Sequence, residues 1–333
     1  MSPFCWGNTD QMYSIIRALK SVGLVTLVFL PLMGMAAVSG SGQDPAVPES
    51  DVPGSPKSSD QLAREMSNPL AAFAGLSYRA EYRRYQGSVP GADDQDNLIH
   101  MFQTVIPFAQ NNGKGFVFRF GIPVNTDQSI YHSDRAYPEW RIRQQDPTLN
   151  GEGEWELTHG HSDDITFDLV YGGVNETGLI LQYGLTGILS TSSDTSNSKQ
   201  QLILGPIMNI GKMARWGEYG ALFSHVFDVD EKTGKNTPDT SETTIRAYFG
   251  YGLGNGWQIV SNPVISYDWQ ADSGNKLALP LGGGVAKTTR IGKMPLRLAA
   301  ELYNYVESTD RFGPEWLFTF TINPVAWNKY TRK

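Results

Sequence analysis

Apolar and polar residues alternate along repeated stretches of this chain after Ala74, and this pattern constrains its fold more than any other feature. In the stretch 243–253 the odd-numbered positions include Ile245, Phe249 and Leu253, whereas the even-numbered positions are polar or small. Because successive side chains of a β-strand point to opposite faces, the alternation predicts a strand with one apolar and one polar face. The fold must therefore give the two faces of its sheet different surroundings.

Twelve segments fit this description. The alternation is clear in six of them, 76–83, 116–124, 243–253, 257–269, 294–303 and 312–322, and weaker in six others, 97–108, 164–172, 178–189, 201–211, 216–227 and 276–287. Their length of about ten residues is that of a tilted strand that crosses a bilayer. A soluble β-sandwich also alternates, so the alternation alone leaves both folds open.

The connections between the segments favour a membrane barrel. The first, third and later odd-numbered connections are mostly long and polar, and cover 87–96, 125–163, 190–200, 228–241, 270–275 and 306–311. The even-numbered connections are short, with turn residues such as the Asn-Asn-Gly of 111–113, and cover 109–115, 173–177, 212–215, 254–256 and 288–293. Outer-membrane barrels have long loops outside and short turns in the periplasm.

The hydrocarbon of a membrane requires the sheet to close into a barrel. In hydrocarbon every backbone N–H and C=O must be paired within the protein, so a sheet spans a membrane only when it closes on itself. The 38 aromatic residues (15 Phe, 15 Tyr and 8 Trp) include Trp257 and Trp269 at the ends of one apolar face, as interfacial girdles require. We therefore predict an all-β fold, a 12-stranded antiparallel transmembrane β-barrel of outer-membrane type over 74–323. A sandwich with these aromatics in its core is the alternative.

The N-terminal segment predicts export. Residues 1–42 read as a signal peptide, because Arg17 and Lys20 precede an apolar stretch over 22–38 and small residues follow it. A retained anchor helix is the alternative. Residues 43–73 read as a periplasmic linker with a short helical lead-in, and 324–333 as a C-terminal tail. We expect the protein in the bacterial outer membrane. The single cysteine, Cys5, would be lost with the signal peptide.

Charge limits the partners. The formal net charge is −7, and Lys and Arg are scattered along the chain, so a nucleic-acid partner is not expected. The expected partners are outer-membrane lipid, small-molecule solutes and the barrel-assembly machinery. No segment indicates a cofactor.

Charged residues on the polar faces are the candidate pore-lining residues, with a selectivity ring and a structural ion-pair plug as equal alternatives. Closure of the last strand onto the first is expected to bring Glu315 near Arg79. The ten candidates are Arg79, Glu81, Arg83, Arg119, Asp168, Glu218, Arg246, Arg297, Glu301 and Glu315.

Short motifs in a fixed order resemble a known group, the outer-membrane transporters of the "MetA-pathway of phenol degradation" family. They lie over most of 61–324, at 61–71, 103–108 (QTVIPF), 204–207 (LGPI), 219–222 (YGAL), 224–226 (SHV), 266–269 (SYDW) and 313–316 (GPEW). The resemblance implies a twelve-strand barrel that moves small hydrophobic or aromatic compounds. Two features depart from it, the long loop 125–163 and the basic tail that follows the last strand.

Catalytic and metal sites are weakly indicated. Ser224 and His225 are neighbours in one segment and should face opposite sides, so they do not form a catalytic pair. His159 and His161, followed by Asp163 and Asp164, have a spacing that metal sites use, but no metal is expected. We predict a channel rather than an enzyme. The alternatives are a plugged barrel that acts as a surface receptor or scaffold, and a membrane esterase that uses Ser224.

Overall fold

The structure is a computed structural model, which describes residues 58–67, 73–110, 113–132, 136–137, 154–192, 201–229, 239–272, 275–292 and 294–327. The chain divides into two units, 1–55 and 56–333, and all described residues belong to the second. The predicted signal peptide and most of the predicted linker lie outside the described residues, as do residues 328–333 of the predicted tail.

The described chain contains one α-helix, α2 (Ser59–Ser67), followed by strands. The strands are β1 (Phe73–Gln86), β2 (Asp96–Ala109), β3 (Lys114–His132), β4 (Ala136–Tyr137), β5 (Glu154–Ser162), β6 (Ile165–Val174), β7 (Leu179–Leu189), β8 (Ile203–Ala214), β9 (Gly217–Asp228), β10 (Ser241–Gly254), β11 (Trp257–Ser261), β12 (Val264–Asp268), β13 (Leu277–Ile291), β14 (Met294–Glu307) and β15 (Gly313–Trp327). Among the described residues, no helix is long and apolar enough to cross a membrane.

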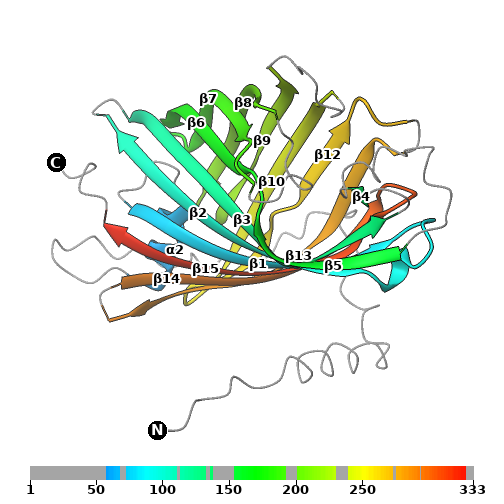
Figure 1. Cartoon of the computed structure of the whole chain (residues 1–333). Helices are drawn as coiled ribbons and strands as arrows, with labels where there is room; N and C mark the ends of the chain where they lie inside the picture. The colour runs from blue at the N-terminus through cyan, green and yellow to red at the C-terminus, as the bar shows by residue number, and fades with distance from the viewer. Residues whose placement is uncertain are drawn as a thin grey trace, which may run out of the picture. The chain divides into compact units, whose positions relative to one another are not determined.

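The strands form one closed antiparallel barrel (Figure 1). Thirteen strands follow one another around it, and β11 and β12 share one crossing of the wall, which leaves twelve crossings. The last strand pairs with the first over nearly its whole length, with Glu81 opposite Thr319. Each described strand of the wall is paired on both sides, which confirms the predicted 12-stranded barrel.

The two faces of the wall have opposite chemistry. Leu185, Phe249 and Phe318 lie on the outer face with 55%, 40% and 44% of their surface exposed, whereas Asp168 and Glu301 on the inner face are buried. A belt of large, exposed apolar side chains is stable in lipid and costly in water. The outer face therefore excludes the sandwich, whose large apolar side chains would pack against one another inside.

One end of the barrel carries the short turns and the other the long connections, and we call them the turn end and the loop end. The connections at the turn end, 110–113, 175–178, 215–216, 255–256 and 292–293, have two to four residues. They are shorter than predicted because several strands run further, β13 to Ile291 instead of residue 287. The last strand also continues to Trp327, so the predicted boundary at 324 falls inside it.

The connection predicted over 125–163 is partly a β-ribbon. The second half of β3 pairs with β5, from Val124 opposite Ser162 to His132 opposite Glu154 (Figure 1). Alternation missed this ribbon because it continues beyond the point where β6 leaves β3, at Gly121. A ribbon outside the bilayer has no need of an apolar face, so its sequence 125–129 is polar at every position.

The predicted strand 257–269 is interrupted. Asn262 and Pro263 separate β11 from β12, and both strands pair with β10 and with β13. Proline has no N–H to give to the sheet, so the ladder breaks at this point. Asn262 lies at this break, on the even-numbered face of the stretch, and its side chain donates to Glu301 of the inner wall at 2.8 Å.

Aromatic residues tie the connections of the loop end together. Tyr85 stacks on Phe312 with ring centroids 4.3 Å apart, and Trp155 of β5 lies 4.9 Å from Phe312. The indole N–H of Trp155 also donates to the carbonyl of Pro90 at 2.8 Å. The ribbon is thus held to two other connections of the loop end.

Two arginine substitutions on the outer face test the lipid belt. Leu185→Arg, in the middle of β7, is expected to cost about 2–4 kcal/mol of unfolding free energy, and Leu253→Arg, next to a turn, about 0–1 kcal/mol. Urea unfolding in lipid vesicles measures both. Equal costs at the two depths would contradict a membrane-spanning outer face.

Candidate functional site

The inner wall holds a carboxylate that is shared by two arginines. Arg119 of β3 and Asp168 of β6 are opposite each other in neighbouring strands, and their side chains form an ion pair at 3.0 Å. Thr186, opposite Asp168 on the other side, donates its hydroxyl to Oδ1 at 2.6 Å. The ion pair and the hydrogen bond both form because the alternation of the strands turns these three side chains toward the inside of the barrel.

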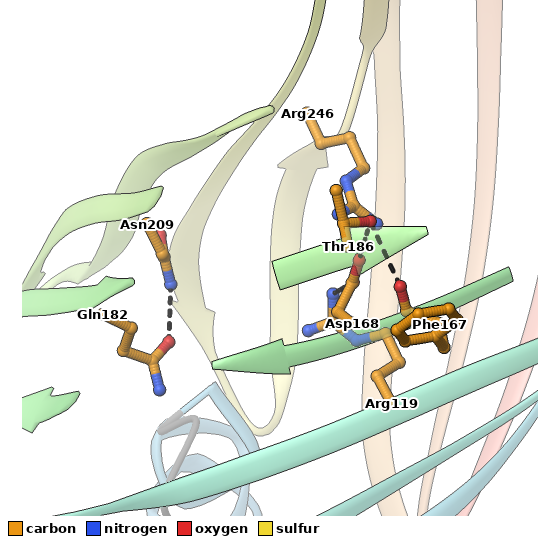
Figure 2. Close-up of polar contacts among 7 residues, drawn as sticks. All are labelled: Arg119, Phe167, Asp168, Gln182, Thr186, Asn209 and Arg246. Atoms are coloured by element: carbon orange, nitrogen blue, oxygen red, sulfur yellow. Dashed lines mark hydrogen bonds and ion pairs between the residues drawn. The ribbon is translucent and has the colours of Figure 1, made fainter. Parts of the chain in front are cut away.

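The second arginine comes from across the barrel. Arg246 of β10 reaches Oδ1 of Asp168 at 3.0 Å, although β7, β8 and β9 separate their strands in the wall. Figure 2 shows Arg246 pointing down onto Asp168, with Arg119 on the opposite side of the carboxylate. Such a link is possible only through the interior of the barrel, so it crosses the lumen rather than following the wall.

A network of neutral polar groups lies further toward the turn end. Asn209 donates to the side-chain oxygen of Gln182 at 2.9 Å (Figure 2) and accepts from the hydroxyl of Tyr248 at 3.1 Å. Tyr248 fits because two glycines lie beneath it. A Cβ atom at Gly211 or Gly220 would come within 2.0 or 2.4 Å of its hydroxyl oxygen.

An apolar layer separates these two polar groups. Val117, Val170 and Ile207 form a buried cluster, and Val105 and Leu222 pack against it. In the register, Val117 and Val170 are opposite each other and lie two residues from Arg119 and Asp168. The inner wall thus runs from charged to apolar to amide side chains within a few residues.

A second shared carboxylate lies on β1. Glu81 pairs with Arg79 at 2.6 Å and with Arg83 at 2.7 Å, all three from one strand. Alternate residues of a strand share a face, so the three groups meet without any contribution from a neighbouring strand.

A third group surrounds Glu301. This carboxylate accepts from Asn262 at 2.8 Å and from the hydroxyl of Tyr303 at 2.5 Å. Arg297 lies within electrostatic reach of both Glu301 and Glu218. Glu218 has its own space because Gly250 lies opposite it, where a Cβ atom would come within 2.6 Å of the carboxylate.

The expected approach of Glu315 to Arg79 is wrong. In the observed register Arg79 lies opposite Thr321, six residues from Glu315, and its ion pair is with Glu81. Glu315 is the extra residue at a register shift between β1 and β15, where Arg84 lies opposite Trp316 and Tyr85 opposite Pro314. A bulge cannot be seen in an alternation pattern.

Six polar residues of these groups were not among the sequence candidates: Thr186, Gln182, Asn209, Tyr248, Asn262 and Tyr303. They are neutral, so a pattern of charged residues on the polar faces does not include them. All six lie at positions whose inward orientation the alternation of their strands indicated. Asn262 is one of the even-numbered positions on the polar face of the stretch 257–269.

Helix α2 covers part of the inner wall at the turn end. It begins with a reciprocal cap, in which the Ser58 amide donates to the Gln61 side chain at 2.7 Å and the Gln61 amide to the Ser58 hydroxyl at 3.2 Å. The carboxylate of Asp60 then accepts the amides of Asn255 and Gly256, at 3.1 and 2.6 Å. The helix is thereby fixed to the turn between β10 and β11.

Helix α2 contacts β13, and the covered face of β13 is the inner one. Ala286 and Thr288 are 1% and 0% exposed, whereas Val285 and Ile291 on the other face are exposed. Since Leu62 of the helix is also buried, α2 lies on the lumen side of the wall.

Three of the catalytic and metal candidates, Ser224, His225 and Asp164, have described side-chain surroundings. Ser224 is buried on the inner side, whereas His225 bonds Thr243 at 2.9 Å on the outer side. Asp164 accepts the amides of Thr191 and Ser192, both at 2.9 Å. The residues that the structure describes contain no group of three or more His, Cys, Asp and Glu that could hold a metal ion.

Removing the shared charge should destabilise the barrel. Asp168→Asn leaves two guanidinium groups without their common carboxylate, and we expect a loss of about 1–3 kcal/mol. Urea unfolding in vesicles measures the loss, with the exposed Glu307→Gln as the control for removal of one negative charge. A loss no larger than the control's would show that the cross-lumen link does not hold the structure.

Asp60→Ala should release α2 from the turn. Loss of two hydrogen bonds to backbone amides, about 1 kcal/mol, predicts about fivefold faster amide exchange at 255–256. Hydrogen-exchange mass spectrometry in detergent measures this rate. Asp94→Ala, the same change in an exposed residue at the loop end, should leave the rate unchanged, and equal rates in all three proteins would show that the contact is not formed.

Comparison with known proteins gives a fold but no family. No family model matches the sequence, and no curated protein matches it. Among solved structures, an outer membrane channel from Pseudomonas putida F1 is similar with a TM-score of 0.51 and 10% identity, over 76% of this chain and 94% of that one. This likeness shows that the barrel has the fold of a known outer-membrane protein.

Two further solved structures are less similar. The NanC porin has a TM-score of 0.41 and 8% identity, over 76% of this chain and 98% of that one. The outer membrane phospholipase A from Escherichia coli has a TM-score of 0.36 and 10% identity, over 75% of this chain and 92% of that one. Neither likeness supports an argument about function.

Proposed function

We propose that this protein is an outer-membrane channel for small molecules. One observation carries the proposal: a closed wall faces lipid with its apolar side and encloses charged side chains that are partly exposed. The side chains of Arg79 and Arg246, on the inner wall, are 39% and 30% exposed. Since they point away from the lipid, that exposed surface faces the interior of the barrel.

Export fits this role. Residues 1–42 would be the signal peptide, and 43–73 the periplasmic lead-in, whose helix α2 lies at the turn end. The turn end would then be periplasmic and the loop end external, as in other outer-membrane barrels. The outer face would contact outer-membrane lipid, and the barrel-assembly machinery would insert it.

The ten charged candidates from the sequence would set selectivity as pore-lining residues. The narrowest point would be the link between Arg246 and Asp168, because it joins opposite parts of the wall at 3.0 Å. The apolar layer of Val117, Val170 and Ile207 beside it suits solutes with an apolar body. The resemblance to transporters of the phenol-degradation family points to the same substrate class, and the similar Pseudomonas putida protein is a channel.

A plugged barrel that serves as a receptor or scaffold is the second candidate. Two observations favour it, the cross-lumen link and the position of α2 on the inner wall. An esterase is disfavoured, because Ser224 and His225 belong to opposite faces of β9.

Conductance separates the two candidates. In planar bilayers the purified protein should conduct small ions, and Arg246→Ala should raise the single-channel conductance, since it removes the side chain that crosses the lumen. Arg84→Ala is the matched control, because Arg84 lies on the other face of β1 and contacts a loop carbonyl. Absence of conductance in all three proteins would favour the plugged barrel.

A further inference from the structure

The charges of the inner wall are unequally accessible. In both shared-carboxylate groups the acid side chain is 7% exposed, while its arginines are 24–39% exposed. The carboxylates lie against the wall and the guanidinium groups lie over them. Water and solutes inside the barrel therefore meet arginine and not carboxylate at these two places.

The formal charges point the same way. Each group holds two arginines and one acid, so each carries a net charge of 2 − 1 = +1. An arginine side chain has five N–H donors, and one shared carboxylate cannot accept hydrogen bonds from all the donors of two arginines. Arg119 and Arg246 therefore keep donors available for an anion that enters the lumen.

The third group and Glu315 bring the formal charge of the ten candidates to 5 − 5 = 0, so the preference depends on which charges are accessible and not on their sum. The two acids of the third group outnumber Arg297, but Glu218 and Glu301 are 9% and 7% exposed, and Glu301 is already bonded to Asn262 and Tyr303. Glu242 and Asp268 are opposite each other at the loop end of β10 and β12, four residues beyond Arg246. Charges at a mouth are screened by salt more than charges inside.

The surroundings of Arg119 and Arg246 narrow the ligand further. The apolar layer of Val117, Val170 and Ile207 begins two residues from the shared carboxylate Asp168. A carboxylate with an apolar body would place its charge on the two guanidinium groups and its body along this layer. Guanidinium groups bind carboxylates through paired hydrogen bonds.

We propose that the lumen selects anions, and that Arg119 and Arg246 form a binding site for small carboxylates with an apolar body. The inference rests on the proposed channel function for the path that anions take through the barrel. The binding site itself does not depend on that function. The proposed preference for anions is the opposite of what the net charge of −7 of the whole chain would by itself favour, which is cations. The arrangement of the charges, rather than their sum, decides the preference.

Reversal potentials test the selectivity. In planar bilayers under a KCl gradient, the full-length protein should pass chloride in preference to potassium. Arg119→Gln with Arg246→Gln should reduce the permeability ratio about fivefold, as expected for the loss of charge near the ion path. Arg84→Gln, the same change on the outer side of β1, should leave the ratio unchanged. A wild-type ratio that favours potassium would overturn the inference, whether or not the double variant folds.

Ligand binding tests the site without conduction. Benzoate should raise the temperature at which the detergent-solubilised barrel loses its compact form on gels, and benzamide, its neutral counterpart, should not. The double variant should lose the benzoate effect. Stabilisation by benzoate without conductance would refute the channel and keep the site. Conductance without anion preference and without a benzoate effect would refute the site and keep the channel.

Discussion

Hydrogen bonding of the backbone within lipid is the constraint on which the rest of this structure depends. A strand in hydrocarbon has no water to satisfy its N–H and C=O groups, so the sheet must close. Pairing of β1 with β15, from Phe73 opposite Trp327 to Gln86 opposite Gly313, achieves the closure. Closure then separates two environments, and every alternate residue is assigned to lipid or to the lumen. The inner polar groups exist only because the wall shields them from lipid.

On the inner wall, charged side chains form ion pairs with one another, and the arginines are the more accessible partners. Glu81 and Asp168 each hold two arginines, and Thr186 adds a hydrogen bond to Asp168. A buried carboxylate without such partners would cost several kcal/mol. The pairing therefore stabilises the inner wall and at the same time leaves arginine as the accessible group. Structure and selectivity arise from the same contacts, so the ion-pair plug and the selectivity ring are not exclusive.

Lipid explains which parts of the fold the sequence predicts. Strands whose outer face meets lipid need an apolar residue at every second position, so all twelve crossings were visible. The ribbon of β3 and β5 lies beyond the lipid and has no such requirement, and the break at Pro263 depends on a missing N–H rather than on polarity. The charged residues on the polar faces were likewise visible in the sequence, but the pairs that they form were not. Arg246 meets Asp168 from four strands away, which only the curvature of the closed sheet determines.

The most direct test of the two-faced wall is a spin-label scan along β10, at positions 243–253 of a chain in which Cys5 is replaced, in lipid vesicles. Odd-numbered positions should be accessible to oxygen dissolved in lipid, and even-numbered positions to a water-soluble nickel complex, with a period of two. Loss of this alternation, or access of the nickel complex to positions 245 and 249, would contradict a cylinder with lipid outside and water within.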